Sequence, residues 1–188
     1  MLKKLLLAAV LVLAAFAVFV ASRPGSYRVS RSRTIAAPPL TVYPLVADFH
    51  HWERWSPWAK LDPAMKTTYD GPVAAVGSSY AWNGNEKVGE GKMTIVEARP
   101  GERLRLRLEF VKPFASTSST EFTFAAKAGG TETAWTMEGH NDFLGKAFSV
   151  FMNMDRMIGN DFEKGLSQLE AVAEAEVSAP PAAAAAAR

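Results

Sequence analysis

The sequence predicts an α+β fold in which a curved antiparallel sheet wraps around a long C-terminal helix. Residues 143–172 repeat large apolar side chains at three- and four-residue steps, which is the spacing of one helix face. Several segments between residues 66 and 139 alternate apolar and polar side chains, as strands with one buried face do. A helix with such a wide apolar stripe must pack on a broad surface, and the strands provide one.

The composition allows one domain with a sizeable hydrophobic core. Of the 188 residues, 48% are hydrophobic, and 21 basic residues nearly balance 19 acidic ones, for a net charge of +2. So small an imbalance does not indicate a nucleic-acid-binding surface, and we expect no nucleic-acid partner. Because the chain has no cysteine, disulfides and thiolate metal sites are excluded.

Residues 1–22 stand apart as a membrane anchor or a signal sequence. Lys3 and Lys4 precede an uncharged run at residues 5–21, which reaches the lower limit of a membrane span, about 17–25 residues. Phe19 spoils the most obvious signal-peptidase site, so we expect an uncleaved single-pass anchor, with secretion after cleavage as the alternative. The two lysines favour an N-terminus inside and a domain on the outer, periplasmic side. Arginines in the next segment favour the opposite orientation, unless they fold into a strand.

The folded domain is expected over residues 27–172. It follows a short linker at residues 23–26 that contains a proline and a glycine. Residues 173–188 are rich in alanine and proline, and we expect them to form a disordered tail without chemistry.

The first strand and two short helices open the domain. The strand at residues 27–35 carries arginines on both faces, which suits a sheet edge. Two prolines at residues 38–39 can open a helix at residues 40–49, because missing amide donors cost nothing there. Trp52 and Trp55 are three residues apart and can face inward from one helical turn, either as a core plug or as a pocket wall.

Six further strands are expected, at residues 66–69, 78–82, 88–98, 103–110, 117–126 and 131–139. Residues 103–110 alternate most clearly, with leucines and a phenylalanine on one face and three arginines and a glutamate on the other. A solvated face explains these arginines better than an anion-binding patch does, because the alternation alone demands polar residues there.

The order of strand, two short helices, six strands and long helix is a helix-grip pattern. Together with particular residues, it resembles the START-like (Bet v 1-like) superfamily, specifically the bacterial SRPBCC proteins of the polyketide cyclase/dehydrase type. The residues that carry this resemblance are Ile35–Pro38, Asp48–Phe49, Trp52–Trp58, Gly77–Trp82, Val88–Met93, Phe110–Phe114, Trp135–Gly139 and Asp161–Leu166. The resemblance implies an apolar cavity between sheet and helix. Relatives bind lipids, sterols, plant hormones or polyketides, and some cyclise or dehydrate polyketides.

The first functional hypothesis is a membrane-anchored domain that binds a hydrophobic small molecule or a lipid, as a monomer. Methionines among aromatic side chains suit an adaptable pocket. The inward groups expected to contact the ligand are Trp55, Tyr80, Trp82, Met93, Phe110, Phe122, Phe124, Trp135, Met137, Phe151 and Met154.

Two alternatives remain open. A polyketide cyclase/dehydratase-like enzyme would use His140, Glu90 or Tyr80 for proton transfer, although no catalytic motif supports one. An interaction domain without ligand would expose an apolar patch. Adjacent His50 and His51 point to different sides of a helix and no zinc-type spacing occurs, so we expect no metal and no cofactor.

Overall fold

The alternating segments form seven strands of one antiparallel sheet. The computed structural model describes residues 1–178. The strands are β1 (Ser26–Ile35), β2 (Lys66–Asp70), β3 (Ser79–Asn83), β4 (Glu90–Arg99), β5 (Arg103–Lys112), β6 (Ser116–Lys127) and β7 (Gly130–His140). Their order in the sheet is β1-β7-β6-β5-β4-β3-β2, so the arginine-bearing first strand lies at an edge, as predicted.

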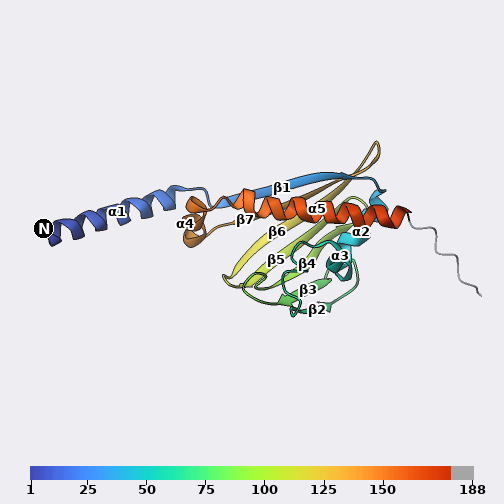
Figure 1. Cartoon of the computed structure of the whole chain (residues 1–188), viewed down its shortest axis with the longest axis horizontal. Coiled ribbons are helices and arrows are strands. Elements are labelled where there is room, and N and C mark those ends of the chain that lie inside the picture. Colours follow the sequence, from blue (N-terminus) through green and yellow to red (C-terminus); the bar gives the residue numbers. More distant parts are fainter. Residues whose placement is uncertain (179–188) are drawn as a thin grey trace, which may run out of the picture.

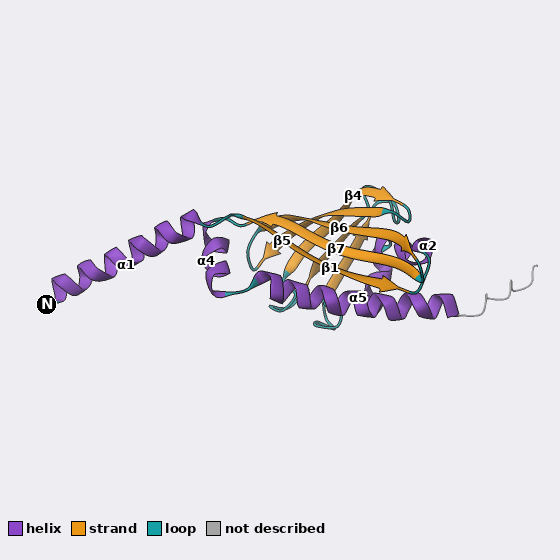
Figure 2. Cartoon of the chain, turned by 90° about the horizontal axis from the view of Figure 1, so that it is seen from above, coloured by secondary structure: helices purple, strands orange, loops and turns teal. Residues whose placement is uncertain are grey.

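The helices are α1 (Leu2–Ser22), α2 (Pro39–Ala47), the 3-10 helix η1 (Phe49–His51), α3 (Trp52–Trp55), α4 (Phe143–Phe151) and α5 (Met154–Ser178). Some of them, chiefly α2 and α5, cover the concave side of this sheet, whereas α1 and α4 lie beyond its end (Figures 1 and 2). Figures 1 and 2 show α5 running along the sheet beside β1, while α1 projects away from the domain. The predicted α+β arrangement, a curved sheet around a C-terminal helix, is confirmed.

Strand register decides which side chains face the helices. Leu104 pairs with Phe122, and Phe122 pairs with Trp135, so these three form a row across β5, β6 and β7. All three are buried. On the other face of the sheet, Arg105 pairs with Glu121 at 2.8 Å, which agrees with the predicted solvated face.

Arginines of β1 hold α5 in place along the sheet edge. Arg31 donates to Asp155 at 3.1 Å and to Glu163 at 2.7 Å, and these acids lie on separate turns of α5. A side chain at Gly159 would overlap the Arg31 guanidinium, so the absence of one leaves room for Arg31 to lie against the helix. Exposed ion pairs add little stability, and their main effect here is to fix the position of α5.

The C-terminal helix is broken, in contrast to the single helix expected at residues 143–172. Met152 has an extended backbone, and the Asn153 side chain accepts a hydrogen bond from the Arg156 amide at 2.9 Å. Asparagine is a favoured N-cap, so the first turn of α5 is stabilised at this point and α4 becomes a separate helix. Asp142 caps α4 in the same way, by accepting from the Gly145 amide at 2.8 Å.

Helix α5 also extends further than expected. It continues past Val172 to Ser178, into the segment predicted to be disordered from residue 173. Ala173 is buried, so packing against the domain stabilises this extension. The remainder of the predicted tail, residues 179–188, lies outside the described residues.

Helix α1 is long and apolar enough to cross a membrane. A signal sequence at an N-terminus has the same properties, so the helix alone does not distinguish an anchor from a cleaved signal. Nearly all its side chains are exposed, with Val20 the buried exception. Arg28, Arg31 and Arg33 lie in β1, inside the folded domain.

Candidate functional site

The middle of the concave face is filled by stacked aromatic side chains. The Trp135 ring stacks on Phe162 of α5 at 4.1 Å between centroids and on Phe122 of β6 at 4.8 Å. Trp55 meets Trp135 edge-on at 5.7 Å and is held by a hydrogen bond from its Nε1 to the Leu45 carbonyl at 2.8 Å. These rings bury large areas against one another, so this part of the concave face is core.

Toward α4 the inward side chains become progressively less covered. Along β5, Leu104 and Leu106 are 0% exposed and Leu108 is 9% exposed, while Phe110 is only partly buried. The facing helix shows the same trend, because Phe162 is buried and Ile158, one turn nearer α4, is partly buried. We call this region, formed by Leu108, Phe110, Ile158, Tyr27 and Ser118, the open end of the concave face.

Two hydroxyl groups lie among the apolar side chains of the open end. Ser118 is buried, and its Oγ has no hydrogen-bond partner among the described residues. Burial raises the pKa of the Tyr27 phenol, and the nearby Ser118 hydroxyl partly opposes that rise. A side chain at Gly139 would overlap the Tyr27 ring, so Tyr27 lies directly over the β7 backbone. An unpartnered buried polar group is costly, which makes the Ser118 hydroxyl, with the Tyr27 hydroxyl near it, a candidate for binding a polar group of a ligand.

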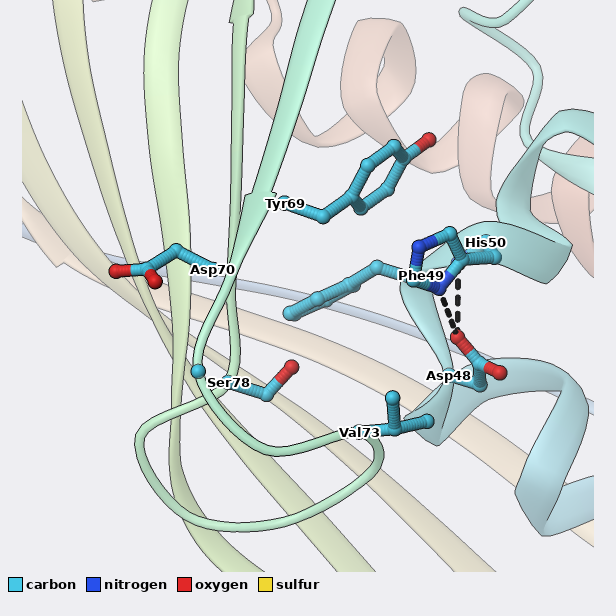
Figure 3. Close-up of a pocket in the computed structure, with 8 residues that line it drawn as sticks. Asp48, Phe49, His50, Tyr69, Asp70, Val73 and Ser78 are labelled. Carbon is cyan, nitrogen blue, oxygen red and sulfur yellow. Dashed lines mark hydrogen bonds and ion pairs between the residues drawn. The ribbon is translucent and has the colours of Figure 1, made fainter.

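A separate pocket of about 180 Å³ lies between η1 and the β2–β3 connection (Figure 3). Asp48 accepts hydrogen bonds from the His50 ring Nδ1 at 2.7 Å and from the His50 amide at 3.0 Å. Burial tends to raise the pKa of Asp48, but these bonds outweigh it and the pKa is lowered. The His50 ring stacks on Tyr69 at 4.1 Å. Ligand pockets usually measure about 300–1,000 Å³, so this one is too small for a lipid.

Comparison with known proteins agrees with this architecture. The family model described as "Polyketide cyclase / dehydrase and lipid transport" matches residues 26–174, which is most of the chain. The chain belongs to this family. The match begins at β1 and ends within α5, so α1 lies outside the family domain.

Solved structures of this family's fold resemble the chain at low sequence identity. Protein CV1439 from Chromobacterium violaceum is 20% identical, with a TM-score of 0.58 over 78% of this chain and 96% of that one. An uncharacterised protein from Rhizobium leguminosarum is 18% identical, with a TM-score of 0.61 over 81% and 97%. The di-domain ARO/CYC StfQ from the steffimycin biosynthetic pathway is 10% identical, with a TM-score of 0.62 over 82% and 53%. No curated protein matches the chain.

The eleven side chains predicted to contact a ligand occupy three different environments in this family member. Seven belong to the buried core: Trp55, Trp82, Met93, Phe122, Phe124, Trp135 and Met137. Three are partly buried: Tyr80, Phe110 and Met154. Phe151 is 78% exposed on α4 and lies outside the concave face. None of the eleven lines the pocket of Figure 3.

The three predicted proton-transfer residues are not brought together. Tyr80 packs against the core between Tyr69 and Trp82, and partial burial, followed by the neighbouring Tyr69 and Glu53, raises its pKa to about 12. Glu90 pairs with Lys112 at 2.7 Å. His140 ends β7 as an exposed residue, with its ring close to the Gly25 backbone. Within residues 1–178, no group of histidine and acidic side chains has an arrangement that could hold a metal ion.

Three residues of the open end were not predicted as site residues from the sequence: Tyr27, Ser118 and Ile158. The available signal was the phase of β6, where Ser118 occupies the same inward phase as Phe122 and Phe124. A polar residue at an inward-facing strand position is either a core hydroxyl with a hydrogen-bond partner or part of a binding site. Only the burial of the neighbouring side chains distinguishes these two cases.

Proposed function

We propose that the chain is a membrane-anchored member of this family that binds a hydrophobic small molecule or a lipid at the open end of the concave face. The observation that supports the proposal is that side-chain burial decreases along β5, from fully buried Leu104 to partly buried Phe110. Apolar side chains left uncovered inside a concave sheet favour an apolar ligand, because each gains burial when the ligand binds.

The chemistry of the open end favours an amphiphile over a plain hydrocarbon. Leu108, Phe110 and Ile158 offer an apolar surface, while the Ser118 and Tyr27 hydroxyls offer hydrogen bonds nearby. A carboxyl, hydroxyl or ester group on the ligand would bond the Ser118 Oγ, which otherwise has no partner among the described residues. The family's description includes lipid transport, which is consistent with such a ligand.

For localisation, we propose an uncleaved anchor in α1 with the domain on the outer side of the membrane. Lys3 and Lys4 lie in the first turn of α1, before its uncharged run, and they favour an inside N-terminus. The arginines of β1 belong to a folded strand, which reduces their influence on orientation. The mass of the chain isolated from membranes tests this: a chain beginning at Met1 is expected, and one lacking residues 1–21 would indicate a cleaved signal.

Photo-crosslinking with a diazirine-bearing fatty acid tests ligand binding. The full chain is placed in phosphatidylcholine nanodiscs, irradiated with the probe, and the labelled peptides are mapped by mass spectrometry. We expect labelling in β5, β6 and the first turns of α5. Phe110→Ser should lower this labelling about tenfold, since burying a phenylalanine side chain is worth about 1.5–3 kcal/mol.

Val96→Ser is the matched control, because Val96 is an exposed apolar residue of the neighbouring strand β4. It should leave the labelling unchanged. Labelling confined to α1 and α4, or labelling of β5 that Phe110→Ser does not reduce, would overturn the proposal.

A further inference from the structure

Helix α4 exposes an unusual concentration of large apolar side chains. Its sequence is strongly amphipathic, yet none of its residues is buried. We define the α4 patch as its exposed apolar residues together with Met152, which follows the helix: Phe143, Leu144, Phe148, Phe151 and Met152. Helices of soluble domains turn such a stripe toward the core, so a stripe turned outward marks a surface that something else covers.

The patch is continuous with a further exposed aromatic residue, which lies in a loop between two strands. Phe114, in the connection between β5 and β6, is exposed, and its ring lies 6.0 Å from the ring of Phe148. The β5–β6 connection therefore extends the α4 patch toward the open end of the concave face, where Phe110 lies near the end of β5.

Helix α4 also lies against the C-terminal end of α1, as Figure 1 shows. The rings of Phe151 and Phe16 are 5.9 Å apart, and the Lys146 ammonium donates to the Ala21 carbonyl at 3.4 Å. The two contacts lie at different positions along the axis of α1 and therefore define the direction in which α4 runs. Its Lys146 meets the end of α1, and its Phe151 lies beside an earlier turn.

The depth of this contact matches that of an interfacial helix. Phe16 precedes the end of α1 at Ser22 by about 9 Å, at a rise of about 1.5 Å per residue. If α1 crosses a bilayer and ends at its surface, Phe151, which lies beside Phe16, is about 9 Å below that surface. Amphipathic helices on membrane surfaces bury their apolar face to a similar depth, about 5–10 Å. Lys146 and Arg23, whose guanidinium lies 5.1 Å from the Phe19 ring centre, then fall at headgroup level, where cations are favoured.

From these contacts we propose that the α4 patch and Phe114 are embedded in the leaflet at the C-terminal end of α1. The break at Met152–Asn153 is what turns α4 from the axis of α5 toward α1. In consequence, the open end of the concave face abuts the same leaflet, and its ligand is a membrane amphiphile taken up directly from it. This inference rests on the proposed anchor, and the experiment below separates the failure of one from the failure of the other.

Single-cysteine labelling tests the proposal cleanly, because the chain has no cysteine of its own. Phe148→Cys and Phe151→Cys probe the patch, Leu11→Cys probes the middle of α1, and Ser32→Cys, at an exposed residue of β1, provides the aqueous control. The full chain is reconstituted in phosphatidylcholine nanodiscs, which leave both membrane faces accessible. The rate of reaction with a membrane-impermeant maleimide is measured, and nitroxide labels at the same positions report collisions with oxygen and with a water-soluble nickel complex.

We expect the two patch positions to react at least about tenfold more slowly than Ser32→Cys, and their nitroxides to collide preferentially with oxygen. Patch positions as reactive as Ser32→Cys beside a protected Leu11→Cys would overturn the inference and leave the anchor standing. A reactive Leu11→Cys would overturn the anchor itself. Protection accompanied by dipolar broadening between patch nitroxides would show that a second copy of the chain covers the patch, which also overturns the inference.

Discussion

Replacing each of two buried tryptophans with phenylalanine tests how the aromatic core is held together. Trp55 and Trp135 are both fully buried and lie 5.7 Å apart in the same cluster. They differ in one respect, because the Trp55 Nε1 donates to the Leu45 carbonyl at 2.8 Å, whereas the Trp135 Nε1 has no partner among the described residues. Trp55→Phe and Trp135→Phe therefore form a matched pair.

The expected magnitudes follow from that difference. Both substitutions remove the same part of an indole ring, and the resulting loss of packing should cost each variant about 1–3 kcal/mol. Trp55→Phe also leaves a buried carbonyl without its donor, at a cost of about 1–3 kcal/mol. Trp135→Phe instead removes an unpaired donor, which offsets part of its packing loss. The free energy of unfolding should thus be about 2–4 kcal/mol lower for Trp55→Phe than for Trp135→Phe.

Urea unfolding of the full chain in detergent micelles, followed by far-ultraviolet circular dichroism, measures this difference without relying on tryptophan fluorescence. Equal destabilisation of the two variants, or greater destabilisation of Trp135→Phe, would contradict the assigned difference in hydrogen bonding between the two indoles. That result would mean that the Trp135 indole is hydrogen-bonded in solution.

Three further predictions concern packing and titration. Gly165→Ala should lower the free energy of unfolding by about 1–3 kcal/mol, because its Cβ would lie 2.8 Å from the buried Trp135 ring. The control Asn160→Ala, at an exposed position of the same helix, should not lower it, and equal losses in the two variants would contradict the packing. The pKa of Asp48 is depressed below its ordinary 3.8, so the stability that the ionised carboxylate contributes is lost as the pH falls below that value. The free energy of unfolding should therefore fall less steeply with acid in Asp48→Asn than in the wild type. An unchanged pH profile would contradict the pairing of Asp48 with His50. The Tyr80 pKa of about 12 means that burial favours the neutral phenol, so its contribution to folding stability is lost only as the pH rises above 10. Ultraviolet titration of the folded chain should show the Tyr80 tyrosinate forming near pH 12. Ionisation of Tyr80 near pH 10 would contradict its burial.

Local patterns were sufficient to predict most of the fold. The leucines of residues 103–110 alternate so regularly that the buried face of β5 could be predicted before any pairing was known. Trp52 and Trp55 were predicted to face inward from their three-residue spacing, and both are buried. The break between α4 and α5 was missed because Leu144, Phe148 and Phe151 continue the apolar spacing of the following helix, although Asn153 offered a capping signal.

The site was harder to predict than the fold, for a physical reason. Side chains that fill a core and side chains that contact a ligand share the same inward phase of a strand, so Phe122 and Phe110 look equivalent in sequence. Which of them is covered depends on where α5 crosses the sheet, and this is set by contacts of Arg31 with Asp155 and Glu163 over a large sequence separation. Such contacts leave no local signature.

Native mass spectrometry of the full chain, extracted gently from membranes, shows directly whether the protein carries an apolar ligand at the open end. We expect the wild-type chain and Val96→Ser to carry an apolar molecule that is released on collisional activation. Phe110→Ser, whose side chain at the open end is lost, should appear mainly as the bare protein. A wild-type chain that appears bare, or an adduct retained equally by Phe110→Ser, would contradict ligand binding at the open end.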